Sequence, residues 1–386
     1  MKVGIPKEIV KGETRVAVIP SMISVFIKNQ HEVFVQSGAG EGSSFSDDEY
    51  REAGAVIVKD PVELYGSIDV LFKVQPPTLH PKSKKHEVEM LREGTALIGF
   101  LSPAYNADAI RKLAGRKITS FAMEFVPRIS RAQNMDALSS MATIAGYKAV
   151  LIAANQLGKI FPLIMSAAGT IPPATILVLG VGVAGLQAIA TAKRLGARVQ
   201  AFDPRPAVKE QVESLGAQFV PLEVLKDVET KDGYAKEQPE EFLNRERKVI
   251  GERFPMVDVV ITTAQIFGKK APLLITEEMV QQLPAGSVIV DLAAEQGGNC
   301  VLTEPGKIVE KHNVSIYGAV NLPAAVPIHA SQLYSKNVTN LFQHLYSDPE
   351  KGLDFEDEIT KGVCITYNGE IINDFVKNLL KTGGEI

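Results

Sequence analysis

Short apolar runs alternate with amphipathic stretches along the chain up to about Val126. The apolar runs predict strands at Lys2–Ile5, Glu32–Gln36, Ala55–Val58, Asp69–Lys73, Ala96–Phe100 and Thr119–Phe121. The amphipathic stretches predict helices, which include Ser21–Asn29, Ser46–Ala53 and Ala107–Ala114. Strands that alternate with helices at this spacing predict a parallel α/β layer.

A second alternation of the same kind follows a long apolar helix, which is predicted at Asp136–Leu157. Its strands are predicted at Thr175–Leu179, Arg198–Phe202, Asp258–Thr262, Ser287–Asp291 and Ser315–Tyr317. From about Ala330 the chain is predicted to be helical and then to form a hairpin about an Asn-Gly turn. We therefore predict two Rossmann-like, doubly wound parallel-sheet domains with a cleft between them. The first comprises residues 1–135 and 328–386, and the second comprises residues 136–327.

The stretch Ile160–Ala192 contains no charged residue and has the length of a bilayer span. Pro162, Pro172 and Pro173 interrupt it, and a glycine-rich turn occupies its second half. A short strand and an apolar helix explain the missing charges, so we predict no transmembrane segment. The opening residues are strand-like and lack the apolar core of a signal peptide.

The composition is typical of a soluble protein, with 45% hydrophobic and 22% charged residues and a formal net charge of -4. A mildly acidic chain without a basic block argues against nucleic acid as a partner. The two cysteines, Cys300 and Cys364, lack metal-ligand spacing and suit a reducing compartment. None of the histidines pairs with an obvious nucleophile, so the sequence predicts neither a hydrolytic triad nor a metal site.

A predicted buried strand is followed by a glycine-rich turn, an amphipathic helix and a second strand in the run that ends at Asp203. Gly180 permits the tight turn, Gly182 lets the backbone approach a pyrophosphate, and Gly185 lets the helix pack closely on the sheet. The helix begins near Val183 and presents free N–H groups and the positive end of its dipole to phosphates. This combination predicts a dinucleotide-binding site.

The carboxylate of Asp203 indicates which dinucleotide is bound. Asp203 lies 18 residues after Gly185, near the spacing at which an acidic residue accepts hydrogen bonds from a ribose 2′-OH. A carboxylate there favours the diol of NAD and repels the extra phosphate of NADP. Two alternatives remain, because Arg205 suits pairing with a 2′-phosphate and Asp203 suits the N-cap of a helix. The residues favour NAD over NADP.

The segment of residues 223–248 is more than half charged and contains Tyr234 beside a glycine. Such a segment suits a solvated helical insertion. It equally suits a movable lid that places a tyrosine over a bound cofactor. The residues alone favour neither alternative.

Arg128, Gln133, Asp136 and Ser139 cluster where the first predicted domain leads into the second. Their hydrogen-bonding groups suit the carboxamide and ribose of a nicotinamide. The alternative is a capped helix start, with Asp136 near its first turn.

A looser set consists of polar residues at strand ends or in loops, namely Arg15, Lys73 and Glu295. Ligands are bound at such positions, which makes the set a candidate for substrate contacts. For Arg15 and Lys73, however, the expectation is a surface ion-pair network.

Together these motifs resemble the NAD(H)-binding component of the proton-translocating nicotinamide nucleotide transhydrogenases. The resemblance covers nearly the whole chain and includes the glycine-rich turn with its helix. It is also carried by Pro127-Arg-Ile-Ser-Arg-Ala-Gln133, Gly233-Tyr-Ala-Lys-Glu237 and Asp291-Leu-Ala-Ala-Glu-Gln-Gly-Gly-Asn-Cys300. The wider superfamily includes alanine dehydrogenase, which shares the opening Lys2-Val-Gly-Ile-Pro-Lys-Glu and the region of Arg15.

Alanine dehydrogenases use a histidine as acid and base in the segment that matches Leu97–Ala104, where this chain has Ser102. A serine is a poor proton shuttle near neutral pH. The aspartate that precedes Gln-Gly-Gly in that family is Glu295 here. Direct hydride transfer between two nicotinamide rings needs positioning and no such acid or base. The resemblance therefore favours a transhydrogenase over an alanine-dehydrogenase-like enzyme, with a non-catalytic NAD-binding module as the third alternative.

The resemblance implies roles for individual residues. Arg128, Asp136 and Ser139 would hold the nicotinamide and its ribose, and Gln133 would reach the second nucleotide's ring across a subunit interface. Tyr234 would lie on a mobile loop of about residues 223–248 that closes over NAD(H). The adenosine and pyrophosphate half is assigned to Gly180, Gly182, Val183, Ala184, Gly185, Asp203, Arg205, Thr263 and Ala264.

The resemblance also implies partners. NADP(H) would be bound by a separate subunit, and the proton channel would belong to a separate membrane component. We therefore expect this chain to be a cytoplasmic, homodimeric subunit that is peripheral on the inner face of the membrane. It would bind NAD(H) and no metal.

Overall fold

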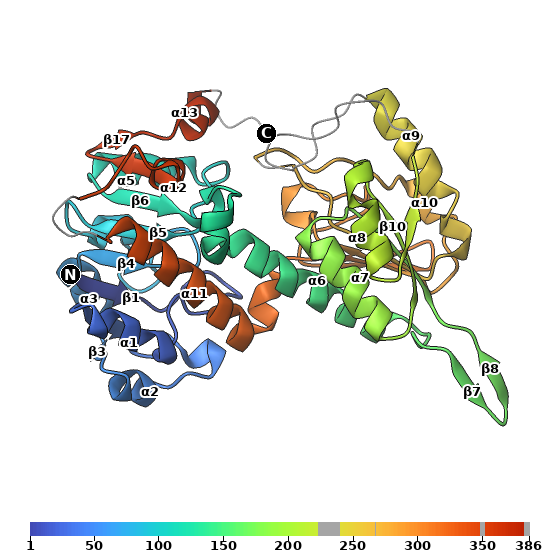
Figure 1. Cartoon of the computed structure of the whole chain (residues 1–386), viewed down its shortest axis with the longest axis horizontal. Helices are drawn as coiled ribbons and strands as arrows, with labels where there is room; N and C mark the ends of the chain where they lie inside the picture. Colours follow the sequence, from blue (N-terminus) through green and yellow to red (C-terminus); the bar gives the residue numbers. More distant parts are fainter. Residues whose placement is uncertain (223–239, 267, 348–351, 382–386) are drawn as a thin grey trace. The chain divides into compact units, whose positions relative to one another are not determined.

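The structure is a computed structural model that describes residues 1–222, 240–266, 268–347 and 352–381. The chain forms two compact units, each built around its own sheet (Figure 1). Unit 1 comprises Met1–Met141 and Pro323–Ile386, and unit 2 comprises Ala142–Leu322. The predicted fold class of two doubly wound, mainly parallel sheets is confirmed.

Unit 1 contains an eight-stranded sheet in the order β17-β16-β6-β5-β4-β1-β2-β3. Its parallel strands are β1 (Lys2–Ile5), β2 (Glu32–Gln36), β3 (Val56–Val58), β4 (Val70–Phe72), β5 (Ala96–Gly99) and β6 (Thr119–Ala122). The antiparallel strands β16 (Cys364–Tyr367) and β17 (Glu370–Ile371) extend the sheet beyond β6. Asn368 and Gly369 join them with φ angles of 49° and 88°, as the Asn-Gly signal predicts for a tight hairpin.

The helices of unit 1 begin at recognisable sequence signals. Proline occupies the first turn of three of them, and a Ser46–Glu49 capping box begins α2. The helices are α1 (Pro20–Lys28), α2 (Asp47–Glu52), α3 (Pro61–Ser67), α4 (Glu87–Met90), α5 (Ala107–Gly115), α11 (Pro327–Leu345), α12 (Glu358–Val363) and α13 (Asp374–Lys381).

Unit 2 contains a seven-stranded sheet in the order β11-β10-β9-β12-β13-β15-β14. The strands are β9 (Thr175–Leu179), β10 (Arg198–Phe202), β11 (Gln218–Val220), β12 (Val259–Thr262), β13 (Val288–Asp291), β14 (Ile308–Lys311) and β15 (Val314–Gly318). All pairs are parallel except β14 with β15 at one edge. The chain order reverses at β9, which lies between β10 and β12. A ligand crevice is therefore expected at the carboxyl ends of β9 and β12.

The helices of unit 2 are α7 (Val183–Arg194), α8 (Lys209–Ser214), α9 (Glu240–Gly251) and α10 (Glu277–Val280). The helix α9 begins inside the segment of residues 223–248 for which the sequence left a lid or a helical insertion open. Its last part is therefore helical, whereas residues 223–239, with Tyr234, lie outside the described residues.

The predicted linking helix is α6 (Ala137–Gln156), which begins in unit 1 and ends in unit 2. Of the described helices, it alone is long and apolar enough by length and composition to cross a membrane. That test is weak evidence for a span, because core helices pass it too. Ala149, Val150 and Ala153 of α6 belong to the apolar core of unit 2, as a core helix requires.

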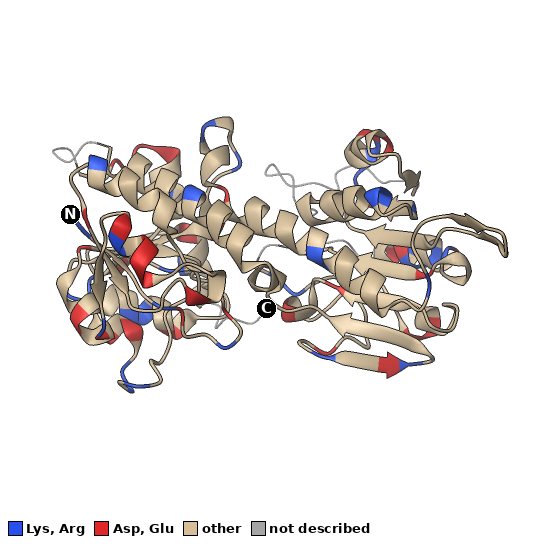
Figure 2. Cartoon of the chain, turned by 90° about the horizontal axis from the view of Figure 1, so that it is seen from below, with Lys and Arg blue, Asp and Glu red and all other residues tan. Residues whose placement is uncertain are grey.

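A short antiparallel hairpin, β7 (Ile164–Ser166) and β8 (Gly169–Ile171), lies within the charge-free stretch of the sequence. The sequence analysis explained that stretch by a single strand and a helix and did not predict the hairpin. Every residue of the two strands is exposed, and none is charged (Figure 2).

Candidate functional site

The glycine-rich turn joins β9 to α7 at the point where the strand order of unit 2 reverses. Gly180 has a φ of 92°, which favours glycine. A Cβ added to Gly185 would lie 2.0 Å from the carbonyl oxygen of Gly180, so a side chain there would clash with the turn. A Cβ added to Gly182 would meet no atom within 4 Å. The backbone at Gly182 is therefore open to an approaching ligand.

The first turn of α7, which contains Val183 and Ala184, begins at Gly182 without any side chain that caps its N–H groups. The N–H groups and the helix dipole together favour an anion at this position. Gly146 of α6 packs against the same turn, because a Cβ at Gly146 would lie 2.1 Å from the carbonyl oxygen of Ala184. The sequence analysis missed Gly146, although a glycine inside a predicted apolar helix is a signal of close packing.

Asp203 follows β10 and lies beside the glycine-rich turn. Its Oδ2 accepts a hydrogen bond from the N–H of Val181 at 2.7 Å. The guanidinium of Arg205 donates from Nε to Oδ1 and from Nη2 to Oδ2, both at 2.8 Å, and the backbone N–H of Arg205 donates to Oδ1 at 2.9 Å. No helix begins at Asp203, because the following turn (Pro206–Val208) and α8 have their N-caps at Arg205 and Val208. The alternative of a helix N-cap is therefore wrong.

Thr263 and Ala264 follow β12 on the other side of the reversal point. The hydroxyl of Thr263 donates to the carbonyl oxygen of Gly180 at 2.9 Å and so fixes the glycine-rich turn. The side chain of Asn299 bonds both backbone groups of Ala264, at 3.1 and 2.8 Å. The buried carboxylate of Asp291 in turn accepts from the N–H of Asn299 at 2.8 Å. Unit 2 therefore brings together its predicted nucleotide-binding residues, apart from Tyr234.

The predicted nicotinamide residues Arg128, Gln133, Asp136 and Ser139 lie in unit 1. Arg128 and Gln133 are exposed, and Gln133 lies in the 3₁₀ turn Ser130–Met135. The carboxylate of Asp136 accepts from the N–H of Ser139 at 2.9 Å and from its hydroxyl at 2.5 Å. Asp136 therefore caps α6, as the alternative to a ligand-binding role predicted, and this cap fixes the positions of both side chains.

Arg15 and Lys73 are buried, so the prediction of a surface ion-pair network is wrong. Arg15 donates to both carboxylate oxygens of Glu13, at 2.8 and 2.6 Å. Lys73 pairs with Glu8 at 3.2 Å and with Glu87 at 2.8 Å. Burial lowers the pKa of Lys73, but the two carboxylates outweigh it and raise the pKa to about 12. Both cations are thus neutralised inside unit 1.

Glu295 is exposed and accepts from the N–H of Asn321 at 3.2 Å. Ser102 has a φ of 44°, and its N–H donates to the carboxylate of Glu124 at 2.5 Å. The N–H of Leu101 donates to the same carboxylate at 3.0 Å. Burial raises the pKa of Glu124 to about 7, although these hydrogen bonds oppose the shift. Sequence analysis missed Glu124, which no local motif marks.

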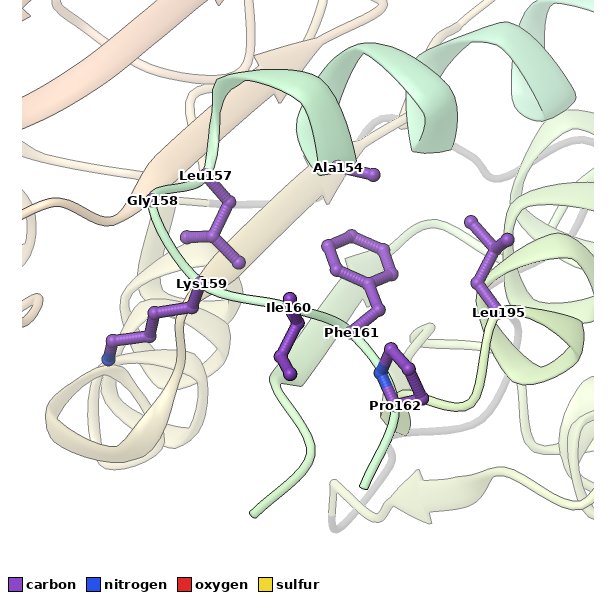
Figure 3. Close-up of a pocket in the computed structure, with 8 residues that line it drawn as sticks. All are labelled: Ala154, Leu157, Gly158, Lys159, Ile160, Phe161, Pro162 and Leu195. Atoms are coloured by element: carbon purple, nitrogen blue, oxygen red, sulfur yellow. The ribbon is translucent and has the colours of Figure 1, made fainter. Parts of the chain in front are cut away.

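The described residues contain no group of three or more His, Cys, Asp or Glu side chains that could hold a metal ion. A shallow apolar cavity of about 590 Å³ lies at the end of α6 and is lined by Leu157, Phe161, Pro162 and Leu195 among others (Figure 3). Its lining contains no residue of the glycine-rich turn. It precedes the β7–β8 hairpin directly in the sequence.

Two family models match the chain. The N-terminal domain of alanine dehydrogenase/PNT matches residues 4–145, and the C-terminal domain of alanine dehydrogenase/PNT matches residues 149–374. An NAD(P) transhydrogenase subunit alpha protein of Rhodospirillum rubrum is 48% identical over 377 residues, which cover 97% of this chain and 98% of that protein.

A solved structure and a more distant relative complete the comparison. The crystal structure of transhydrogenase from Sinorhizobium meliloti matches with a TM-score of 0.84 and 39% identity, over 97% of this chain and 100% of that one. Alanine dehydrogenase 2 of Staphylococcus aureus is 31% identical over 347 residues, which cover 88% of this chain and 85% of that protein. The similarity to the transhydrogenase proteins is thus the stronger one.

Proposed function

The chain belongs to the alanine dehydrogenase/PNT family, and we propose that it is the NAD(H)-binding component of a proton-translocating NAD(P) transhydrogenase. The observation that carries the proposal is the glycine-rich turn with its adjoining Asp203, in a chain that is 48% identical to a transhydrogenase subunit over nearly its whole length. The reaction is direct hydride transfer between NADH on this chain and NADP⁺ on a partner subunit. A separate membrane component carries out proton translocation.

The turn residues of unit 2 hold the adenosine and pyrophosphate half of the nucleotide. The open backbone at Gly182 and the uncapped first turn of α7 receive the pyrophosphate. Asp203 selects NAD(H), because its carboxylate repels a 2′-phosphate. Its bidentate pairing with Arg205 also supports NAD(H), since a 2′-phosphate would compete with Asp203 for that guanidinium.

The residues of unit 1 act on the nicotinamide half. Arg128, Asp136 and Ser139 hold the ring and its ribose, and Gln133 contacts the ring of the second nucleotide. The bound nicotinamide supplies the hydride, and these side chains orient it. Tyr234 closes over the nucleotide. The support for this assignment is the family resemblance, together with the cap that fixes Asp136 and Ser139 at the start of α6.

The paired state of Arg15 and Lys73 argues against an alanine-dehydrogenase-like reaction. An amino or keto acid needs a free cation for its carboxylate and a group that transfers a proton. Both cations are already bonded to buried carboxylates, and Ser102 stands where that family has its histidine.

The partners follow from the proposed reaction. They are an NADP(H)-binding subunit and a membrane subunit with the proton channel, and the chain is a cytoplasmic, peripheral component on the inner face of the membrane. We also propose a homodimer, which the β7–β8 hairpin supports. Met165 is 76% exposed, and Leu163 and Ile171 are each 52% exposed. A contiguous apolar surface of this kind marks a protein interface.

The substitution Gln133→Asn tests the catalytic assignment. Gln133 is exposed on a 3₁₀ turn, so the substitution should leave the fold intact. We expect NADH to bind within about twofold of the wild-type affinity, while hydride transfer to NADP⁺ slows by about tenfold or more, because positioning is lost only in the transfer step. Equal losses in binding and transfer, or no loss in either, would instead favour a non-catalytic NAD-binding module.

A further inference from the structure

A buried glutamate in α9 has no assigned role. Phe242, Glu246 and Ile250 are spaced four residues apart, so they form one stripe on the helix, and each is at most 3% exposed. Glu246 is the only charged member of this stripe. A carboxyl in an otherwise apolar stripe is costly unless it has a partner.

The stripe faces the carboxyl ends of three strands. Ile250 belongs to the same apolar cluster as Leu179, Phe202 and Val220, which are the last residues of β9, β10 and β11. Asp203 follows Phe202 directly. The helix α9 therefore covers the edge of the sheet at which the glycine-rich turn and Asp203 lie.

No described residue donates a hydrogen bond to Glu246. The nearest cation in sequence, Arg247, is directed elsewhere, since its Nε donates to the carbonyl oxygen of Leu273 and its Nη1 to Asn244, both at 2.9 Å. Burial, and next to it the charge of Asp203, raises the pKa of Glu246 to about 8. Glu246 is thus a buried carboxyl whose charged neighbour in the site is Asp203.

Asp203 cannot satisfy a ribose diol by itself. A carboxylate accepts about four hydrogen bonds. The oxygens of Asp203 already accept from the N–H of Val181 and from three N–H groups of Arg205. A nucleotide with two ribose hydroxyls therefore either displaces the Arg205 side chain or bonds a second group.

We propose that Glu246 is that second group, a specificity-determining residue that hydrogen-bonds one hydroxyl of the adenosine ribose beside Asp203. The proposal rests on the proposed NAD(H) site and extends it to α9. The ligand class it selects is a nucleoside with both hydroxyls free. A 2′-phosphate would remove a donor and place two further negative charges beside Asp203 and Glu246.

The experiment measures the dissociation constants of NADH and of its analogues that lack the 2′- or the 3′-hydroxyl of the adenosine ribose. They are measured for the full-length wild type and for Glu246→Leu, which matches the apolar stripe. In the wild type, loss of the bonded hydroxyl should weaken binding by about tenfold. In Glu246→Leu, NADH itself should bind about tenfold more weakly, and the same deletion should cost at most about twofold.

Two further variants separate this role from a structural one. Glu246→Gln keeps a donor and an acceptor and should retain most of the hydroxyl effect. Glu252→Leu removes an exposed carboxyl just beyond the end of α9 and should leave all constants unchanged. If Glu246→Leu does not fold, a hydroxyl effect in Glu246→Gln that equals zero overturns the proposal and a retained one supports it.

Failure of the inference and failure of the proposed function give different results. A wild type that binds NADH, with the same hydroxyl effects in Glu246→Leu, overturns the role of Glu246 alone. A wild type that binds no NADH overturns both.

Discussion

Three glycines in one turn are under three different constraints. Gly180 is held by its positive φ, and Gly185 is held by its contact with the carbonyl oxygen of Gly180. Gly182 has a φ of -80° and open space around it, so nothing in the fold itself requires glycine there. A bound pyrophosphate supplies the missing reason, because only glycine lets the backbone approach it.

Alanine substitutions should therefore separate folding from binding. Gly182→Ala should change the free energy of unfolding by less than about 0.5 kcal/mol, because its φ suits any residue and its Cβ meets no atom. NADH affinity should nevertheless fall by about tenfold or more. Gly185→Ala, the matched control, should cost about 3 kcal/mol, because its Cβ would overlap the carbonyl oxygen of Gly180. Urea unfolding and NADH titration check both. Equal destabilisation of the two variants would contradict this account.

Glu124 should make the stability of the protein depend on pH. Burial raises the pKa of its carboxyl in the folded protein to about 7, from an ordinary value of 4.5. Because the folded pKa is the higher one, the folded state is favoured below pH 4.5, and stability is lost as the pH rises towards 7. The loss is on the order of 3 kcal/mol.

The test compares Glu124→Gln with the wild type in urea unfolding from pH 4.5 to 8. The variant should be flatter over this range and the more stable of the two at pH 8. Glu52→Gln, at an exposed position, serves as the control and should follow the wild type. A wild-type curve that rises from pH 5 to 8, or a variant as steep as the wild type, would refute the assignment.

The sequence predicts those site residues whose signal is local. The spacing of the three glycines and Asp203 carries the whole argument, and the structure gives each glycine a matching constraint. Lys73 was misjudged because its partners are not local, since Glu8 lies 65 residues away from it along the chain. Glu246 was missed for the same reason, because its burial depends on how α9 packs on the ends of the strands.

At the scale of elements, the buried parallel strands are predicted well because they are continuous apolar runs, such as Val288–Asp291. The β7–β8 hairpin was missed because its residues are apolar and yet exposed, a pattern that neither a core strand nor a surface strand gives. The edge strand β14 was also missed, since it is short and mostly exposed.

The exposed hairpin yields a prediction about assembly. Met165→Asp should shift the protein from dimer to monomer, because a charge in an apolar interface is left without a partner. Analytical ultracentrifugation at micromolar concentration measures the shift. Met256→Asp removes a methionine that is 63% exposed elsewhere in unit 2 and should leave the dimer intact. A monomeric wild type, or a Met165→Asp variant that is still fully dimeric, would exclude the hairpin as the interface.

At the scale of the whole molecule, the family predicted from the motifs is confirmed by relatives that match nearly the full length of the chain. The chain joins one unit with an open nucleotide turn to another in which the basic residues Arg15 and Lys73 are neutralised. These features suit a protein that positions one nucleotide for a partner. They do not suit one that binds and protonates a small acid by itself.

The most direct test of this account is stopped-flow hydride transfer from NADH to NADP⁺, with this chain alone and with a purified NADP(H)-binding component. Pyruvate plus ammonium serves as the control substrate for the chain alone. We predict rapid transfer only when both proteins are present, and no oxidation of NADH by pyruvate plus ammonium. Turnover of pyruvate by the chain alone, or no transfer from bound NADH in the presence of the partner, would contradict the account.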